Sequence, residues 1–139
     1  MSFSSHPAWP ALPDSGWGEF WLWLWRSRRR VEVVGNSMAP TLQPGDQVFW
    51  NPKAYTHTTP TVGELVIAQD PRLPQRSLIK RVTAVQGLHE IHGSQGQRQG
   101  QNSMEYELSG DNPGESTDSR HFGRVRSDQI LGQVTSRLP

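Results

Sequence analysis

Apolar residues in this chain come in short runs, and glycine or proline lies close to the end of most of these runs. The chain holds 13 glycines and 11 prolines, and only 33% of its residues are hydrophobic. No run keeps a 3.6-residue apolar period beyond one turn, which argues against long helices. The sequence therefore predicts a mainly β, antiparallel domain with little helix, with strands near residues 31–34, 48–50, 65–68, 78–85, 105–109 and 130–134.

The length of 139 residues suits one folded domain. We expect that domain to span residues 31–139 and residues 1–30 to form a flexible N-terminal segment, because the first 16 residues carry Ser, Pro and Gly with scattered aromatics. Two loops are expected within the domain. Residues 70–74 contain two prolines, which oppose regular strand pairing, and residues 93–103 are mostly Gln, Gly and Ser.

Charge and cysteine content exclude several classes of function. The net charge is +1, so a nucleic-acid-binding surface is not expected. The chain has no cysteine, which excludes disulfides, thiolate metal sites and cysteine catalysis. A cysteine-free chain fits a reducing compartment, and we expect a cytoplasmic protein.

The segment from Trp21 to Arg30 joins tryptophans to a run of arginines. Its uninterrupted apolar part is residues 20–25, much shorter than the roughly 20 residues that span a bilayer. It is no secretory signal either, because the charges follow the apolar run. Two interpretations remain: peripheral contact with a membrane surface, or tryptophans that cap the sheet beside solvated arginines.

Two residues in the body of the chain form a candidate nucleophile and base. Ser37 follows the first predicted strand, where Asn36 and Pro40 favour a turn, and a hydroxyl there needs a base to become nucleophilic. Lys80 lies in an apolar run, and burial would favour its neutral amine. The alternatives are an ordinary turn serine and a lysine whose stem packs on the sheet while its ammonium reaches water.

A third segment, residues 110–120, is dense in Gly, Asn, Ser, Asp and Arg. The serine, lysine and third segments, in this order, resemble the type I signal peptidase family of serine–lysine proteases. The resemblance runs from about residue 31 to the C-terminus and implies the fold that this family shares with self-cleaving repressors. Within the family, the chain is similar to the small branch of nickel-type superoxide dismutase maturation proteases.

The resemblance implies a role for each segment. Ser37 would attack a peptide carbonyl, Lys80 would act as its base, and Ser116 would hydrogen-bond and orient the lysine amine. None of the three segments contains a histidine, so a Ser-His-Asp triad is not expected.

The remaining family positions carry structural roles. The resemblance implies that Asp118 and Arg120 form an ion pair that holds the third segment, and that Asp111 braces the same loop. Gly45 and Asp46 match a structural stretch of the family that precedes a strand.

Two departures from the family pattern concern substrate binding. Gly35 stands where many members carry a serine or threonine that helps to bind the oxyanion, so the backbone N–H of Ser37 is the expected donor. Residues 83–87 replace a Gly-x-Pro-Gly-Asp stretch, which predicts a reduced cap over the site.

No cofactor or metal is expected. His89 and His92 invite a metal interpretation, but a three-residue spacing on a strand places the two imidazoles on opposite faces.

The resulting hypothesis is a serine endopeptidase that removes an N-terminal propeptide from a partner protein, with the nickel superoxide dismutase precursor as the expected partner. One alternative is a general signal peptidase that cleaves exported preproteins. A self-cleaving repressor would need a DNA-binding helix pair that residues 1–30 cannot supply. From a different class comes a catalytically inactive peptide-binding module.

Overall fold

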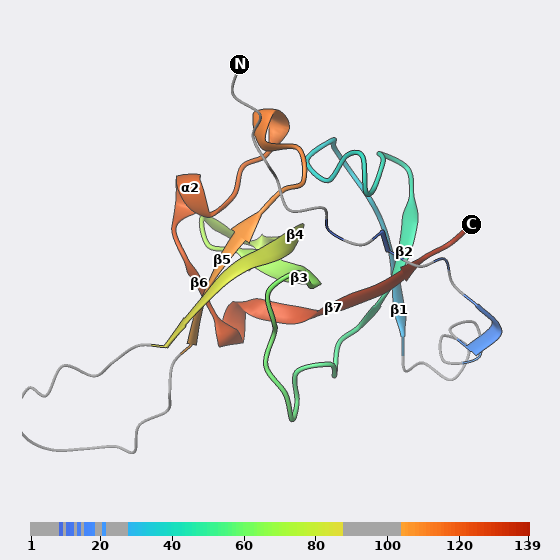
Figure 1. Cartoon of the computed structure of the whole chain (residues 1–139), viewed down its shortest axis with the longest axis horizontal. Helices are drawn as coiled ribbons and strands as arrows, with labels where there is room; N and C mark the ends of the chain where they lie inside the picture. The colour runs from blue at the N-terminus through green and yellow to red at the C-terminus, as the bar shows by residue number, and fades with distance from the viewer. Residues whose placement is uncertain are drawn as a thin grey trace, which may run out of the picture.

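An antiparallel sheet of seven strands, in the order β1-β2-β7-β3-β4-β5-β6, forms the body of the protein (Figure 1). The computed structural model describes residues 9, 11–12, 14, 16–18, 21, 28–87 and 104–139. The strands are β1 (Arg29–Glu32), β2 (Gln47–Asn51), β3 (Leu65–Asp70), β4 (Leu73–Gly87), β5 (Met104–Ser109), β6 (Val125–Arg126) and β7 (Ile130–Arg137).

The prediction of a mainly β domain with little helix is confirmed. Between residues 28 and 139, the described helical elements are one four-residue helix and two 3₁₀ turns: α2 (Ser119–Phe122), η1 (Pro113–Glu115) and η2 (Ser127–Gln129). In the N-terminal segment, Trp17, Gly18 and Trp21 are also helical. No helix in the described part of the chain is long and apolar enough to cross a membrane.

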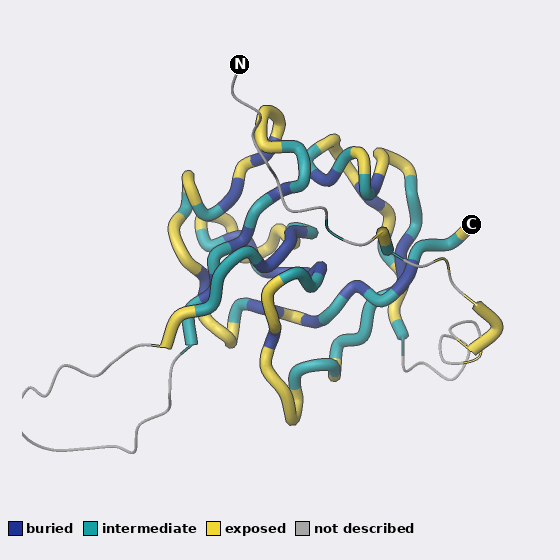
Figure 2. The backbone as a smooth tube through the Cα atoms, viewed as in Figure 1, coloured by how far each residue is buried: buried dark blue, intermediate teal, exposed yellow. Residues whose placement is uncertain are grey.

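The last strand holds the sheet together. β7 pairs with β2 on one side and with β3 on the other, so it joins the N-terminal strands to the β3–β4–β5 meander. Its residues alternate between buried and less buried from Ile130 onward, as expected for a strand with one face on the core. Figure 2 shows buried residues along the crossing strands and exposed residues in the outer turns.

Two apolar clusters form the core. One gathers buried side chains from β2, β3 and β7 together with Met38 and Leu42 from the loop after β1. The other is built on β3, β4, β5 and β6 around the fully buried Tyr106 and Leu108. The buried side chains of Met38 and Leu42 thus anchor the loop after β1 in the first cluster.

Most predicted strands appear within a few residues of their expected bounds, but two differences matter. β1 ends at Glu32 rather than residue 34. The stretch 70–74 is not a plain loop: Asp70 pairs with Leu73 across a tight hairpin, and Pro74 lies inside β4. The register shifts between Gln69 and Asp70, so residues 74–76 have no pairing partner on β3. Pro74, which has no N–H, therefore interrupts no hydrogen bond between the two strands.

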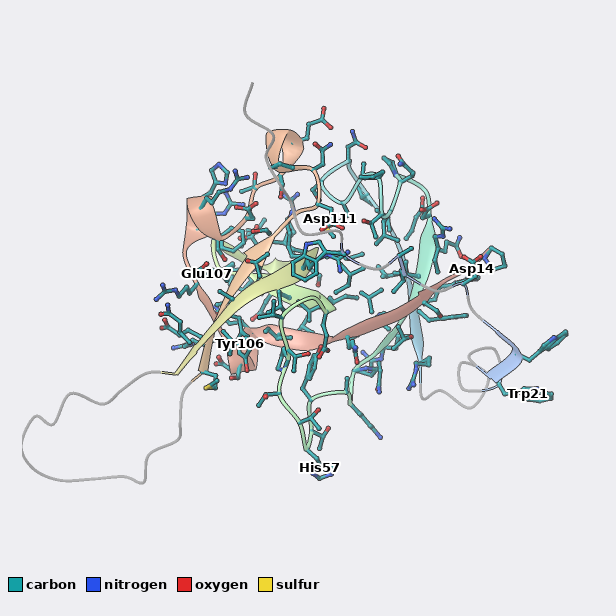
Figure 3. The ribbon with its side chains drawn as sticks, viewed as in Figure 1. Asp14, Trp21, His57, Tyr106, Glu107 and Asp111 are labelled. Carbon is teal, nitrogen blue, oxygen red and sulfur yellow. The ribbon has the colours of Figure 1, made fainter. Side chains whose placement is uncertain are left out.

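Three features predicted from the sequence concern residues that the structure does not describe. The predicted loop 93–103, His89 and His92 lie outside the described residues. In the N-terminal segment, Trp21 is 53% exposed and points away from the sheet (Figure 3).

Candidate active site

Ser37 lies in the turn that follows β1. Gly35 has a φ of 80°, a conformation that glycine adopts without strain, and it turns the chain away from the strand just before Ser37. Met38 and Leu42 on the far side of the turn are buried, and the Leu42 N–H donates to the Met38 carbonyl at 2.9 Å. Ser37 itself is half-buried. A hydroxyl on this turn is therefore held on a rigid support yet stays within reach of a substrate.

The third segment, residues 110–120, is held to the turn of Ser37 by hydrogen bonds. The Asn112 N–H donates to the carbonyl of Ser37 at 2.9 Å, and its side-chain amide donates to the carbonyl of Asn36 at 3.1 Å. Glu115 accepts hydrogen bonds from the side chains of both Asn36 and Asn112. These bonds bring residues separated by about 75 positions into one rigid unit, and Figure 1 shows the two loops at the same end of the sheet.

Gly110 lies where the two loops approach most closely. A Cβ atom at this position would lie 2.2 Å from the Ser116 Oγ and 2.5 Å from the Ser37 carbonyl oxygen. Neither distance is possible for real atoms, so only glycine fits between the two serines.

We expect Gly110→Ala to lower the free energy of unfolding by about 1–3 kcal/mol, because the added methyl group must push the two loops apart. Urea denaturation measures this. Gly114→Ala in the same loop is the matched control, since nothing lies within 4 Å of its Cβ position, and its free energy of unfolding should change by less than about 0.5 kcal/mol. Equal stability of the two variants would contradict the close approach at Gly110.

Lys80 lies on β4 with only 3% of its surface exposed. Its Nζ donates to the Ser116 Oγ at 3.0 Å. Burial lowers the pKa of Lys80 below its ordinary 10.5; the positive charge of Arg76 lowers it further, whereas Asp118 and Asp70 oppose the shift. The side chain is therefore a buried amine that loses its proton more readily than a free lysine, and the Ser116 hydroxyl orients it.

Asp118 is the charge next to this lysine. Burial alone would raise the pKa of Asp118, but hydrogen bonds from the Arg120 side chain and backbone, and a longer one from Gly110, outweigh it and hold the pKa below its usual value. Arg120 Nε lies 2.9 Å from Asp118 Oδ1, and Arg120 Nη2 also donates to the Pro113 carbonyl at 3.1 Å. The pair ties α2 to the loop that carries Ser116.

Asp111 pairs with Arg81, the neighbour of Lys80 on β4. Arg81 is 3% exposed, and its Nε and Nη2 donate to the two carboxylate oxygens of Asp111 at 2.9 and 2.8 Å. Asp111 also accepts a hydrogen bond from the Thr41 hydroxyl at 2.5 Å. It thus links the sheet, its own loop and the turn of Ser37, and Figure 3 shows it between these elements.

Gly45 and Asp46 close the loop between β1 and β2. The Gly45 N–H donates to the Val33 carbonyl at 2.9 Å, and the Val33 N–H donates to the Asp46 carbonyl at 2.7 Å. The Asp46 side chain accepts from the Gln43 N–H, also at 2.9 Å. Gly45 has a φ of 91°, which a side chain would strain. Both residues fix the base of the loop that carries Ser37.

A cleft of about 450 Å³ has Ser37 and Lys80 in its lining. Its lining includes residues 31–36, at and after the end of the edge strand β1, and residues 76–80 of β4. Val33, Ile67 and Ile79 make part of it apolar. Its geometry suits an extended peptide laid beside the nucleophile and the base.

Several residues that build this site were not singled out from the sequence. The sequence carries no local signal for the roles of Arg81, Thr41, Gly110, Asn112 and Glu115 in this site. Asn112 and Glu115 were visible as members of the third segment, but a partner 75 positions away leaves no local pattern. Among the described residues, no group of three or more His, Asp or Glu side chains is arranged to hold a metal ion.

The sequence matches one protein-family model and is similar to individual proteases of known name. The family model described as "Signal peptidase, peptidase S26" matches residues 22–97, which include Ser37 and Lys80. The mitochondrial ATP-independent inner membrane protease subunit 1a of Arabidopsis thaliana is 32% identical, with 78% of this chain and 68% of the relative covered. The mitochondrial inner membrane protease subunit 1 of Mus musculus is also 32% identical, over the same shares of the two chains.

Proposed function

Because the chain belongs to the signal peptidase family, peptidase S26, we propose that it is a serine endopeptidase that removes leader segments from precursor proteins with a Ser-Lys dyad. The observation that carries this proposal is the shared cleft. Ser37 and Lys80 both line it, and the amine that would serve as base is buried, lowered in pKa and bonded to Ser116.

The proposed reaction begins with the neutral amine of Lys80. It takes the proton of the Ser37 hydroxyl while the Ser37 Oγ attacks the scissile carbonyl carbon. The resulting ammonium then gives that proton to the leaving amine as the C–N bond breaks, which leaves an acyl-enzyme on Ser37. The regenerated amine then takes a proton from a water molecule as the water oxygen attacks the ester carbon. The ammonium returns that proton to the Ser37 Oγ as the acyl C–O bond breaks, which releases the product carboxylate and the free enzyme.

Two groups of this chain support those steps. Ser116 holds the lysine Nζ in place at 3.0 Å, which preserves its direction toward the cleft. Among the described residues, the Ser37 N–H donates to no backbone carbonyl, so it is free to bind the negative oxygen that develops on the substrate. Gly35 supplies no side-chain donor for that role.

The substrate would lie in the cleft as an added strand. Residues 31–36 and 76–80 line the cleft beside the peptide, and the apolar side chains of Val33, Ile67 and Ile79 would favour small residues just before the cut. Both relatives are named as inner membrane proteases, which favours general cleavage of leader segments over a single dedicated substrate. The narrower hypothesis, the nickel superoxide dismutase precursor, rests on the sequence resemblance alone. Contact of residues 21–30 with a membrane surface likewise stays a prediction.

A paired substrate experiment tests the proposal. The purified protein is incubated separately with a leader peptide that has small residues before its cleavage site and with the nickel superoxide dismutase precursor. Mass spectrometry identifies any new N-terminus. We expect efficient cleavage of the leader peptide at one bond.

Each other outcome has a definite meaning. Cleavage of the superoxide dismutase precursor alone, immediately before its nickel-binding histidine, would replace the general proposal with the narrower one. If neither substrate is cut at any protein concentration tested, the peptidase proposal is wrong.

A further inference from the structure

The N-terminal segment touches the body of the protein at three described places, all before the region that the family model matches. The Trp9 ring lies under Arg81, with 5.5 Å between its centroid and the Arg81 Cζ. Leu12 packs against the first core cluster. Asp14 pairs with Arg137 of β7 at 3.4 Å. A segment predicted to be flexible therefore contributes side chains to the folded domain.

Arg81, which packs on the Trp9 ring, is a buried cation, and each of its three guanidinium nitrogens donates a hydrogen bond. Arg81 Nε and Nη2 bond Asp111, and Arg81 Nη1 donates to the Gly63 carbonyl at 2.7 Å. Trp9 also covers Gly63, because a Cβ atom there would lie 3.2 Å from the indole ring. An aromatic face over a guanidinium attracts the charge and keeps water from its hydrogen bonds.

Asp111 connects Arg81 to the loop that carries Ser37. It accepts from Thr41, four residues beyond Ser37, and the next residue, Asn112, donates its N–H to the Ser37 carbonyl. The path from Trp9 to Ser37 is thus a sequence of direct contacts through Arg81 and Asp111.

Trp9 also forms one wall of a second cavity, of about 650 Å³. Its lining also includes Pro40 and Thr41 of the Ser37 loop and Gly110, Asp111 and Pro113 of the third segment. Trp9 therefore lines the same cavity as the junction of the two loops that carry Ser37 and Ser116.

We propose that Trp9 is a positioning residue for the active site: it covers the Arg81–Asp111 pair and so fixes the Ser37 turn against the loop of Ser116. The part of the inference that concerns turnover rests on the proposed peptidase function. The part that concerns geometry does not, since the Asn112 amide reports directly on the clamp of the Ser37 turn.

The experiment compares Trp9→Ala, Trp9→Phe and Trp17→Ala in the full chain. Trp17 is a matched control from the same segment and is 80% exposed. Hydrogen exchange of the Asn112 amide is followed by NMR. The reference is the Leu138 amide, which donates to the Gln47 carbonyl where the end of β7 meets β2. Steady-state kinetics on the leader peptide give kcat and KM.

We expect Trp9→Ala to speed exchange at Asn112 and to lower kcat by roughly 2- to 30-fold, the range that one cation–π contact supports, with KM changed less than about twofold. Exchange at Leu138 should stay at the wild-type rate. Trp9→Phe should recover most of both effects because a phenyl ring can still stack, and Trp17→Ala should match the wild type.

Three outcomes would overturn the inference. These are wild-type exchange at Asn112 in Trp9→Ala, equally faster exchange at Asn112 and Leu138, and selective exchange at Asn112 with unchanged kcat. If the wild-type protein cleaves no peptide, the proposed function fails. In that case, faster exchange at Asn112 but not at Leu138 in Trp9→Ala would still support the positioning of the Ser37 turn by Trp9. Unchanged exchange at Asn112 would refute this positioning.

Discussion

Replacing Ser37 with alanine is expected to reduce leader-peptide cleavage by about 10⁶-fold, to the limit of detection, while the protein stays folded. The reaction loses its nucleophile, and no other hydroxyl shares its position. The fold should survive because the turn is clamped through the Ser37 carbonyl, which accepts from Asn112, and alanine keeps that carbonyl. Turnover of a fluorogenic peptide and a thermal melt measure the two effects.

The control for this prediction is Ser127→Ala, an exposed serine of η2, which should retain wild-type turnover. A serine-directed acylating reagent should add its mass to the wild-type protein and not to Ser37→Ala. Such labelling would also separate an enzyme from an inactive peptide-binding module. Full activity in a pure preparation of Ser37→Ala would remove Ser37 from the mechanism.

Replacing Lys80 with arginine is expected to lower kcat by roughly 10²- to 10⁴-fold, the contribution of a general base. Arginine stays protonated at every working pH, so it cannot take the proton from Ser37. Lys80→Ala should be inactive as well. Lys53 is the only other lysine in the chain and is exposed, so Lys53→Arg is the matched control and should behave as wild type.

The pH profile gives an independent measure of Lys80. The neutral amine is the base, so kcat/KM should rise with pH as Lys80 loses its proton. Because burial and the charge of Arg76 lower the pKa of Lys80, with Asp118 and Asp70 opposing, the midpoint of this rise should lie below 10.5. Retained turnover in Lys80→Arg, or a midpoint at the ordinary lysine value, would show that another group is the base.

The amino-acid sequence alone determined the class of fold and the order of the three segments that carry the candidate site. Short apolar runs between glycines and prolines predict strands because turn preference and strand preference act over a few residues. The same local reasoning placed Ser37 in a turn and Lys80 in an apolar strand. It failed at Pro74, where a register shift made room for a proline within β4.

Only the tertiary structure decided which distant residues meet. The insertion of β7 between β2 and β3 and the contact of the loop after β1 with the loop after β5 depend on the order of strands in the sheet. The pairing of Asp111 with Arg81, the closeness at Gly110 and the position of Trp9 follow from that order. Contacts of this kind join residues 30 or more positions apart, from Arg81 and Asp111 to the paired strands β2 and β7. No local preference encodes them, because each depends on where the rest of the chain has packed.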